Sequence, residues 1–263
     1  MTNEWKNDYD DRGYFVIRNY FSHSEIESLK QVILTFHQAW KKDNRRFYEE
    51  EAFNSSLITG SQYLAENDRV DLFNFISSNK MINLMQSIVP NNPTFMNTQL
   101  FFDPFNHQQV NFWHRDCQYD YDIEDQKKVI QNTQVVHLRV PLFDEPGMEI
   151  VPGSHIRWDN DEEFAVRQEE NKHVSNEPLS TGKKIALNVG DILVFSADMI
   201  HRGLYGQDRL AFDTLIFDPT GDGARYADYV DEDCLPDSGI LQKITNKQLF
   251  LNTINLKNEA ELA

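Results

Sequence analysis

The stretch Asn111-Phe-Trp-His-Arg-Asp-Cys117 decides the fold, because its His114 and Asp116 form a His-x-Asp pair that needs a partner from elsewhere in the chain. Side chains two residues apart on an extended strand point to the same face. We therefore expect His114 and Asp116 to present one imidazole nitrogen and one carboxylate oxygen to a single point. Such a pair supplies two of the three protein ligands of a metal site.

A third ligand is available at His201, in Ala197-Asp-Met-Ile-His-Arg-Gly203, which follows the strand-like run 191–196. Two His and one carboxylate on one face of an octahedron suit non-haem Fe(II) and leave three positions open. The same donors bind zinc with a water in the open position, so a zinc-dependent hydrolase is an alternative. A third interpretation is a non-catalytic, cupin-like binding module without metal, and the intact triad argues against it.

The apolar pattern divides the chain into a helical first part and a strand-rich second part. Residues 14–17 predict a short strand, and Ser22 or Ser24 can cap a helix that runs to about Trp40. Two more helices are expected at about 69–77 and 80–88. From Pro93 onward, strand-length runs are separated by Pro, Gly, Asn and Asp, which is typical of a sandwich or barrel.

Alternation within two of the expected strands separates core residues from cavity residues. In 133–142, one face carries four apolar residues, Val136, Leu138, Val140 and Leu142, and the other carries Thr133, Val135, His137 and Arg139. The apolar row should pack under the helices. The mixed row should face the lumen, where a charged group needs a partner or a ligand. Asn97 and Gln99 share a face of 94–102 and, like Arg139, either contact a bound ligand or satisfy one another's hydrogen bonds.

Three polar segments have weaker patterns. Residues 41–67 and 117–132 are expected to be irregular, and 156–182 predicts only a short helix at 161–170. Long loops inside a compact domain are usually functional or mobile, so we expect substrate specificity to reside in the last two. The tail from 239 to 256 predicts one weak helix.

Composition limits the class of protein. The 263 residues are compatible with one large domain, and the net charge of −17 disfavours nucleic acid and anionic membrane surfaces as partners. Two cysteines, Cys117 and Cys234, do not make a disulfide framework. Neither a signal peptide nor a membrane-spanning run is apparent, so we expect a soluble, cytoplasmic protein. Nothing in the sequence specifies the oligomeric state.

Two further motifs lie between and after the two proposed metal-binding segments. Gly147-Met-Glu-Ile-Val-Pro-Gly-Ser-His155 lies between the two metal segments, and Arg209 follows His201 at the start of an apolar run, 210–217. With the N-terminal segment 11–29, this order resembles the phytanoyl-CoA dioxygenase (PhyH-like) family of Fe(II)- and 2-oxoglutarate-dependent oxygenases. The resemblance covers roughly residues 10–218.

The resemblance implies a fold and a division of the chain. The fold is α+β, mainly β: a double-stranded β-helix, or cupin-like jelly roll, with a helical N-terminal layer. Residues 1–263 would form a single dioxygenase domain, in which 1–90 are helical support, 91–218 the jelly-roll core and 219–263 a C-terminal extension. The Pro-Gly-Ser-His turn then makes His155 structural.

The resemblance also implies the chemistry. His114, Asp116 and His201 would bind Fe(II), and 2-oxoglutarate and O2 would complete the site, with hydroxylation of a small organic molecule as the usual outcome. A bidentate guanidinium suits the far carboxylate of 2-oxoglutarate, and Arg209 is the candidate, with Arg202 and Arg139 as rivals. Asn97, Gln99 and Arg139 are further candidates for cofactor binding. Because related halogenases replace the carboxylate ligand by a small residue, Asp116 disfavours halogenation.

The sequence gives less reason to place the remaining histidines and Cys117 in the site. His137 is a candidate for the lumen, and Cys117 lies on the opposite strand parity from the metal pair, so it should pack outside the site. Four histidines lie in polar contexts and are expected to be solvated: His23, His37, His107 and His173. The acidic loops offer few cations for a CoA thioester, so the substrate stays open.

Overall fold

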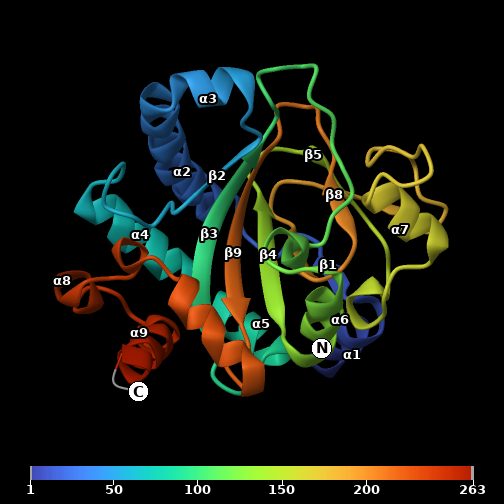
Figure 1. The fold of residues 1–263 in the computed structure, drawn as a ribbon. Coiled ribbons are helices and arrows are strands. Elements are labelled where there is room, and N and C mark those ends of the chain that lie inside the picture. The colour runs from blue at the N-terminus through green and yellow to red at the C-terminus, as the bar shows by residue number, and fades with distance from the viewer. Residues whose placement is uncertain (1, 262–263) are drawn as a thin grey trace.

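The computed structural model describes residues 2–261, and its nine strands form two antiparallel sheets (Figure 1). The larger sheet has the order β1-β7-β4-β9-β3-β2 and comprises β1 (Tyr14–Ile17), β2 (Asn54–Ser56), β3 (Thr94–Phe102), β4 (Val135–Pro141), β7 (Ile192–Ser196) and β9 (Leu210–Phe217). The smaller sheet has the order β6-β5-β8 and comprises β5 (Glu145–Ile150), β6 (Lys183–Leu187) and β8 (His201–Gly203). This arrangement confirms the jelly roll.

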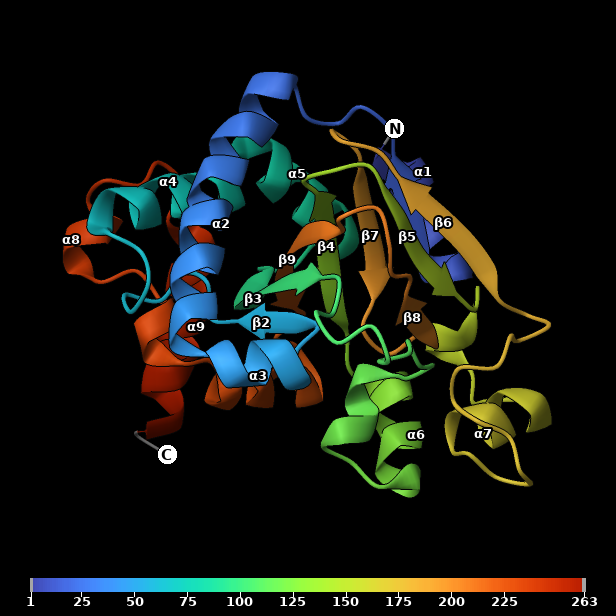
Figure 2. The ribbon, with the colours of Figure 1, turned by 90° about the horizontal axis from the view of Figure 1, so that it is seen from above.

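Helices cover the outer face of the larger sheet, as Figures 1 and 2 show. The covering helices are α2 (His23–Asp43), α4 (Glu66–Ile76), α5 (Asn79–Ile88) and α9 (Gln248–Glu261). The others are α1 (Thr2–Arg12), α3 (Arg45–Glu50), α6 (Ile123–Asn132), α7 (Asp161–Arg167) and α8 (Ser238–Leu241). Ser22 caps α2 through a capping box with Glu25, which settles the choice between Ser22 and Ser24.

The main core lies between this helical layer and the larger sheet. The predicted apolar row packs there: Val136, Leu138 and Val140 of β4, and Leu142 directly after it, are buried in the same core as residues of α2 such as Ile33. A second, smaller core joins the two sheets and includes Met148 of β5 and Phe195 of β7. The opposite row of β4 therefore faces the space between the sheets, as the alternation predicted.

Several boundaries differ from the expectations. The segment 41–67 contains the end of α2, α3 and β2, and 117–132 contains a 3-10 helix and α6. Helix α3 buries no residue, so it has no apolar periodicity to detect. Helix α6 is capped by Asp122 and buries a single short stripe, Gln126, Val129 and Ile130. Pattern reasoning depends on a buried apolar face, which α3 lacks and which in α6 spans only one turn.

The helical content is larger than the mainly β description suggests. The described residues include more helix than strand, because α1, α3 and α6 add to the predicted layer, so strands dominate only in the jelly-roll core. The short helix expected at 161–170 is confirmed as α7. Among helices within residues 2–261, none is long and apolar enough to cross a membrane.

Candidate metal centre

The predicted triad converges. His114, Asp116 and His201 each offer one ligand atom, and these three atoms lie within 4.8 Å of one another. Asp116 Oδ1 is 3.6 Å from His114 Nε2 and 3.5 Å from His201 Nε2. Two imidazole nitrogens and one carboxylate oxygen at these distances can hold a divalent metal ion between them.

The local structure of the triad differs from the expected strand. His114 forms an isolated antiparallel bridge with His201, and Asp116 begins a 3-10 helix, Asp116–Tyr119. Arg115 is extended, with φ −115° and ψ 142°, so its two neighbours still point to the same side. The backbone N–H of Asp116 donates to Ala197 O, which ties this turn to the segment that precedes His201. The shared direction was predicted correctly, whereas the strand was not.

Backbone carbonyls orient both imidazole rings. Nδ1 of His114 lies 3.1 Å from Phe112 O, and Nδ1 of His201 lies 2.9 Å from Met199 O. Each Nδ1 therefore carries the proton and donates it to a carbonyl, which leaves the Nε2 lone pair free and directed at the site. Such contacts are the usual means of orienting histidine ligands.

The protonation states also suit metal binding. Burial lowers the pKa of His114, and burial together with the neighbouring His114 lowers the pKa of His201 to about 3. Burial opposes ionisation of Asp116, yet the hydrogen bond from His137 and the charge of that ring hold the pKa of Asp116 well below the usual range. Neutral imidazoles and an ionised carboxylate are the forms that bind metals.

A cavity of about 440 Å³ between the two sheets contains the triad. The predicted lumen residues Asn97, Gln99, His137, Arg139 and Arg209 all line this cavity, whereas Arg202 does not. The pairing of β3 with β9 shifts register between Phe95 and Asn97, so Met96 also reaches the cavity despite its opposite parity.

The three candidate arginines have different partners. Arg202 is paired with Glu149, at 2.6 and 2.9 Å, and lies over the Trp113 ring. Arg139 donates to both oxygens of Asp213, at 2.8 and 2.9 Å. Arg209 is buried, and within residues 2–261 its Nε and Nη2 have no hydrogen-bond partner; a carboxylate oxygen of Glu145 lies 3.7 Å from Nε, beyond hydrogen-bond distance. Arg209 thus keeps the most donors free for a bound anion.

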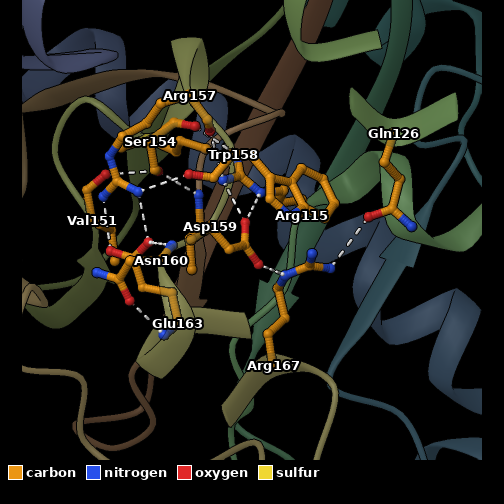
Figure 3. Close-up of polar contacts among 12 residues, drawn as sticks. Arg115, Gln126, Val151, Ser154, Arg157, Trp158, Asp159, Asn160, Glu163 and Arg167 are labelled. Carbon is orange, nitrogen blue, oxygen red and sulfur yellow. Dashed lines mark hydrogen bonds and ion pairs between the residues drawn. The ribbon is translucent and has the colours of Figure 1, made fainter. Parts of the chain in front are cut away.

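Arg115 anchors the loop that carries two of the triad residues, and Figure 3 shows its polar contacts. Its side chain is fully buried and donates to Ser154 O, Asp198 O and Arg157 O, and to the carboxylate of Asp159 at 2.8 and 3.0 Å. The other oxygen of that carboxylate accepts from Arg167 of α7 at 2.8 Å. Ser154 Oγ in turn accepts from the Ile200 N–H, next to His201. The Pro-Gly-Ser-His turn and Arg115 therefore join both metal segments.

The structure also places the remaining histidine and cysteine candidates, and it corrects two of the predictions. His155 packs against Tyr9 and Gly13 of the N-terminal segment, which agrees with a structural role. Cys117 packs against Val129 and Ile130 but also lines the cavity. His37 is 6% exposed, and the prediction that it is solvated was wrong, because α2 turns it toward the aromatic core.

Sequence reasoning missed several residues of the cavity wall. Tyr119 and Tyr121 follow the metal pair, and Tyr205 follows His201. Asp213 joins His137 and Arg139 by hydrogen bonds. The sequence did contain a signal: Asp213 shares one face of the strand 210–217 with the apolar residues Ala211 and Leu215. An acidic residue inside an apolar strand requires a partner.

Comparison with known proteins identifies relatives. The model of the family described as phytanoyl-CoA dioxygenase (PhyH) matches residues 9–205. No curated protein matches. Among solved structures, AviO1 from Streptomyces viridochromogenes Tue57 is 16% identical, with a TM-score of 0.60 over 84% of this chain and 96% of that chain.

Two further solved structures contain ligands. EctD from S. alaskensis, with 2-oxoglutarate and 5-hydroxyectoine, is 14% identical, with a TM-score of 0.58 over 81% of this chain and 74% of that chain. HygX from Streptomyces hygroscopicus, with nickel and 2-oxoglutarate bound, is 16% identical, with a TM-score of 0.57 over 84% of this chain and 88% of that chain. At these identities the similarity shows the shared fold.

Proposed function

Because the chain belongs to the phytanoyl-CoA dioxygenase family, we propose that it is an Fe(II)- and 2-oxoglutarate-dependent dioxygenase that hydroxylates an unactivated C–H bond of a small organic molecule. The observation that carries this proposal is the convergence of His114, Asp116 and His201 in one cavity with an arginine whose donors are free. EctD and HygX, which share the fold, were solved with 2-oxoglutarate.

The residues fit the proposed metal. Three protein ligands on one side leave three positions on the cavity side, and the Nε2 lone pairs and the ionised Asp116 need no rearrangement to bind. Fe(II) with 2-oxoglutarate and O2 supplies the oxidant, and 2-oxoglutarate leaves as succinate and CO2. The chain's own part is to hold the metal, orient the cosubstrate and exclude water.

Arg209 is the residue that we propose for the far carboxylate of 2-oxoglutarate. Its guanidinium is buried in the cavity wall, and its Nε and Nη2 are free to donate in a bidentate pair. Gln99, Asn97 and Arg139 line the same cavity and are proposed to complete this pocket. We disfavour Arg202 for this role, because it is paired with Glu149 and does not line the cavity.

The cavity wall supports a small, largely apolar substrate. Its phenylalanine and tyrosine members are Phe53, Phe101, Phe112, Tyr119, Tyr121, Phe195, Tyr205 and Tyr226. Among the described residues, the Lys or Arg side chains that line the cavity are Arg139 and Arg209, which we assign to the pocket for 2-oxoglutarate. We therefore disfavour a CoA thioester, whose phosphates require cations. SnoK and SnoN, which share the fold, are named carbocyclase and epimerase, so the product must be identified directly.

The test is anaerobic reconstitution with Fe(II) followed by 2-oxoglutarate. A weak visible charge-transfer band is expected, and a zinc hydrolase would give none, because Zn²⁺ has no partly filled d shell. Absence of the band at verified iron occupancy would overturn the proposal. A screen of small molecules for substrate-dependent succinate, with mass spectrometry of the products, then distinguishes hydroxylation from cyclisation or epimerisation.

A further inference from the structure

The two carboxylate oxygens of Asp116 have different surroundings. Oδ1 faces the Nε2 atoms of His114 and His201, at 3.6 and 3.5 Å. Oδ2 lies 2.9 Å from Nε2 of His137, a residue of β4 that is only 1% exposed. One oxygen is therefore directed at the metal position, and the other is already bound within the protein.

His137 is held so that it cannot turn away from Asp116. Its Nδ1 lies 3.0 Å from Asp213 Oδ2, and Asp213 is in turn held by two hydrogen bonds from Arg139. Its ring stacks on Phe195, with centroids 4.6 Å apart and planes 19° apart. Because ionised carboxylates only accept hydrogen bonds, both ring nitrogens must carry protons and donate.

The binding mode of Asp116 decides how many metal positions stay open. Two imidazoles and one carboxylate oxygen leave three of six octahedral positions, which is the number that a chelating 2-oxo acid and O2 require together. If both oxygens of Asp116 bound the metal, only two would remain, and the cosubstrate would occupy both. A group that holds Oδ2 away from the metal would therefore protect the third position.

We propose that His137 is a positioning residue that keeps Asp116 monodentate and thereby preserves the position at which O2 binds beside 2-oxoglutarate. This inference rests on the proposed function. Buried hydrogen-bond partners of metal ligands commonly tune the site in this way.

Two amide substitutions separate the contacts of His137. The amide nitrogen of Gln can take the place of imidazole Nε2, so His137→Gln keeps a donor to Asp116 and loses the donor to Asp213. The shorter Asn places its amide near imidazole Nδ1, so His137→Asn keeps the donor to Asp213 and loses the donor to Asp116. Both variants lose the imidazole ring. They differ in which carboxylate, that of Asp116 or that of Asp213, still receives a hydrogen bond.

The measurement is anaerobic binding of nitric oxide, as a stand-in for O2, to the Fe(II)-loaded protein, followed by electron paramagnetic resonance. With 2-oxoglutarate present, His137→Asn should bind nitric oxide at least about tenfold more weakly than wild type, and His137→Gln within about twofold. Without 2-oxoglutarate two further positions are open, so all three proteins should bind nitric oxide alike. That comparison controls for loss of iron.

Other outcomes separate this inference from the proposed function. If the charge-transfer band with 2-oxoglutarate is present but His137→Asn binds nitric oxide as wild type does, the role of His137 is wrong and the dioxygenase proposal stands. If wild type gives no band, the proposed function itself fails. A crystal structure of the wild-type protein with Fe(II) and 2-oxoglutarate tests the same point without a variant, because coordination through Asp116 Oδ2 would overturn the inference.

Discussion

Gly203 leaves the space that the guanidinium of Arg209 occupies. A Cβ atom added to Gly203 would lie 2.5 Å from Nη1 and 2.8 Å from Nη2 of Arg209. Real Cβ atoms do not approach other atoms this closely, so any side chain at 203 must displace the arginine. Gly203 lies on β8 two residues after His201, and the same short strand therefore carries a proposed metal ligand and makes room for the proposed cosubstrate anchor.

We expect Gly203→Ala to weaken 2-oxoglutarate binding by about tenfold or more, equivalent to about 1.4 kcal/mol. Fe(II) binding should persist, because His201 keeps its backbone position. The control is Gly206→Ala, where an added Cβ meets no atom within 4 Å but φ is +117°, so stability falls without moving Arg209. Titration of the charge-transfer band measures the affinity, and equal affinities in both variants would refute the steric argument.

Arg209→Gln should raise the 2-oxoglutarate requirement further, since losing one partner of a buried charge pair costs about 2 to 5 kcal/mol. Arg202→Gln is the matched comparison, because Arg202 is also buried but is paired with Glu149 outside the cavity. It should lower stability and leave the 2-oxoglutarate affinity unchanged. The reverse ranking of the two affinities would transfer the assignment to Arg202.

Each of His114→Ala, Asp116→Ala and His201→Ala should abolish stoichiometric Fe(II) binding. The fold should survive, because the triad lies outside the main hydrophobic core between helices and sheet. Iron content and circular dichroism of the purified variants provide the check. Full iron retention in His201→Ala would contradict the triad.

Asp159→Asn should loosen the metal centre although Asp159 is not in the triad. The substitution removes the charge that Arg115 and Arg167 share, and breaking a buried ion pair costs about 3 to 5 kcal/mol. Glu163→Gln is the control, since it breaks the neighbouring Arg157 pair without contacting Arg115. We expect both variants to be less stable to urea, but only Asp159→Asn to bind Fe(II) more weakly. Equal iron affinities would reduce Arg115 to a purely structural role.

His37 should make the protein sensitive to mild acid. Burial, reinforced by Lys41, lowers the pKa of His37 from 6.5 to about 4. The unfolded chain therefore takes up a proton before the folded one, and stability is lost as the pH falls from 6.5 to 4, by roughly 3 kcal/mol at most. His37→Phe should reduce this loss, as measured by urea unfolding at pH 7 and pH 4.5. The exposed His23, replaced by Gln, is the control, and a pH dependence unchanged in His37→Phe would contradict the assignment.

The sequence by itself determined the parts of this protein that depend on local periodicity and spacing. The two-residue spacing of His114 and Asp116 sufficed to place both on one side, because any extended residue between them gives that result. Alternation along 133–142 separated core from cavity for the same reason. Helices without a buried apolar face, such as α3, gave no such signal.

Only the tertiary structure decided which partners these residues meet. Asp116 and His137 are 21 residues apart, His137 and Asp213 are 76, and no local pattern specifies such pairs. The same holds for Arg209 and its rival Arg202, since only the structure shows that Glu149 lies beside Arg202 and that Arg209 lines the cavity. A hydrogen bond requires two atoms to lie about 3 Å apart, whatever their separation in the sequence. The partner of each of these residues is therefore decided only when the chain folds.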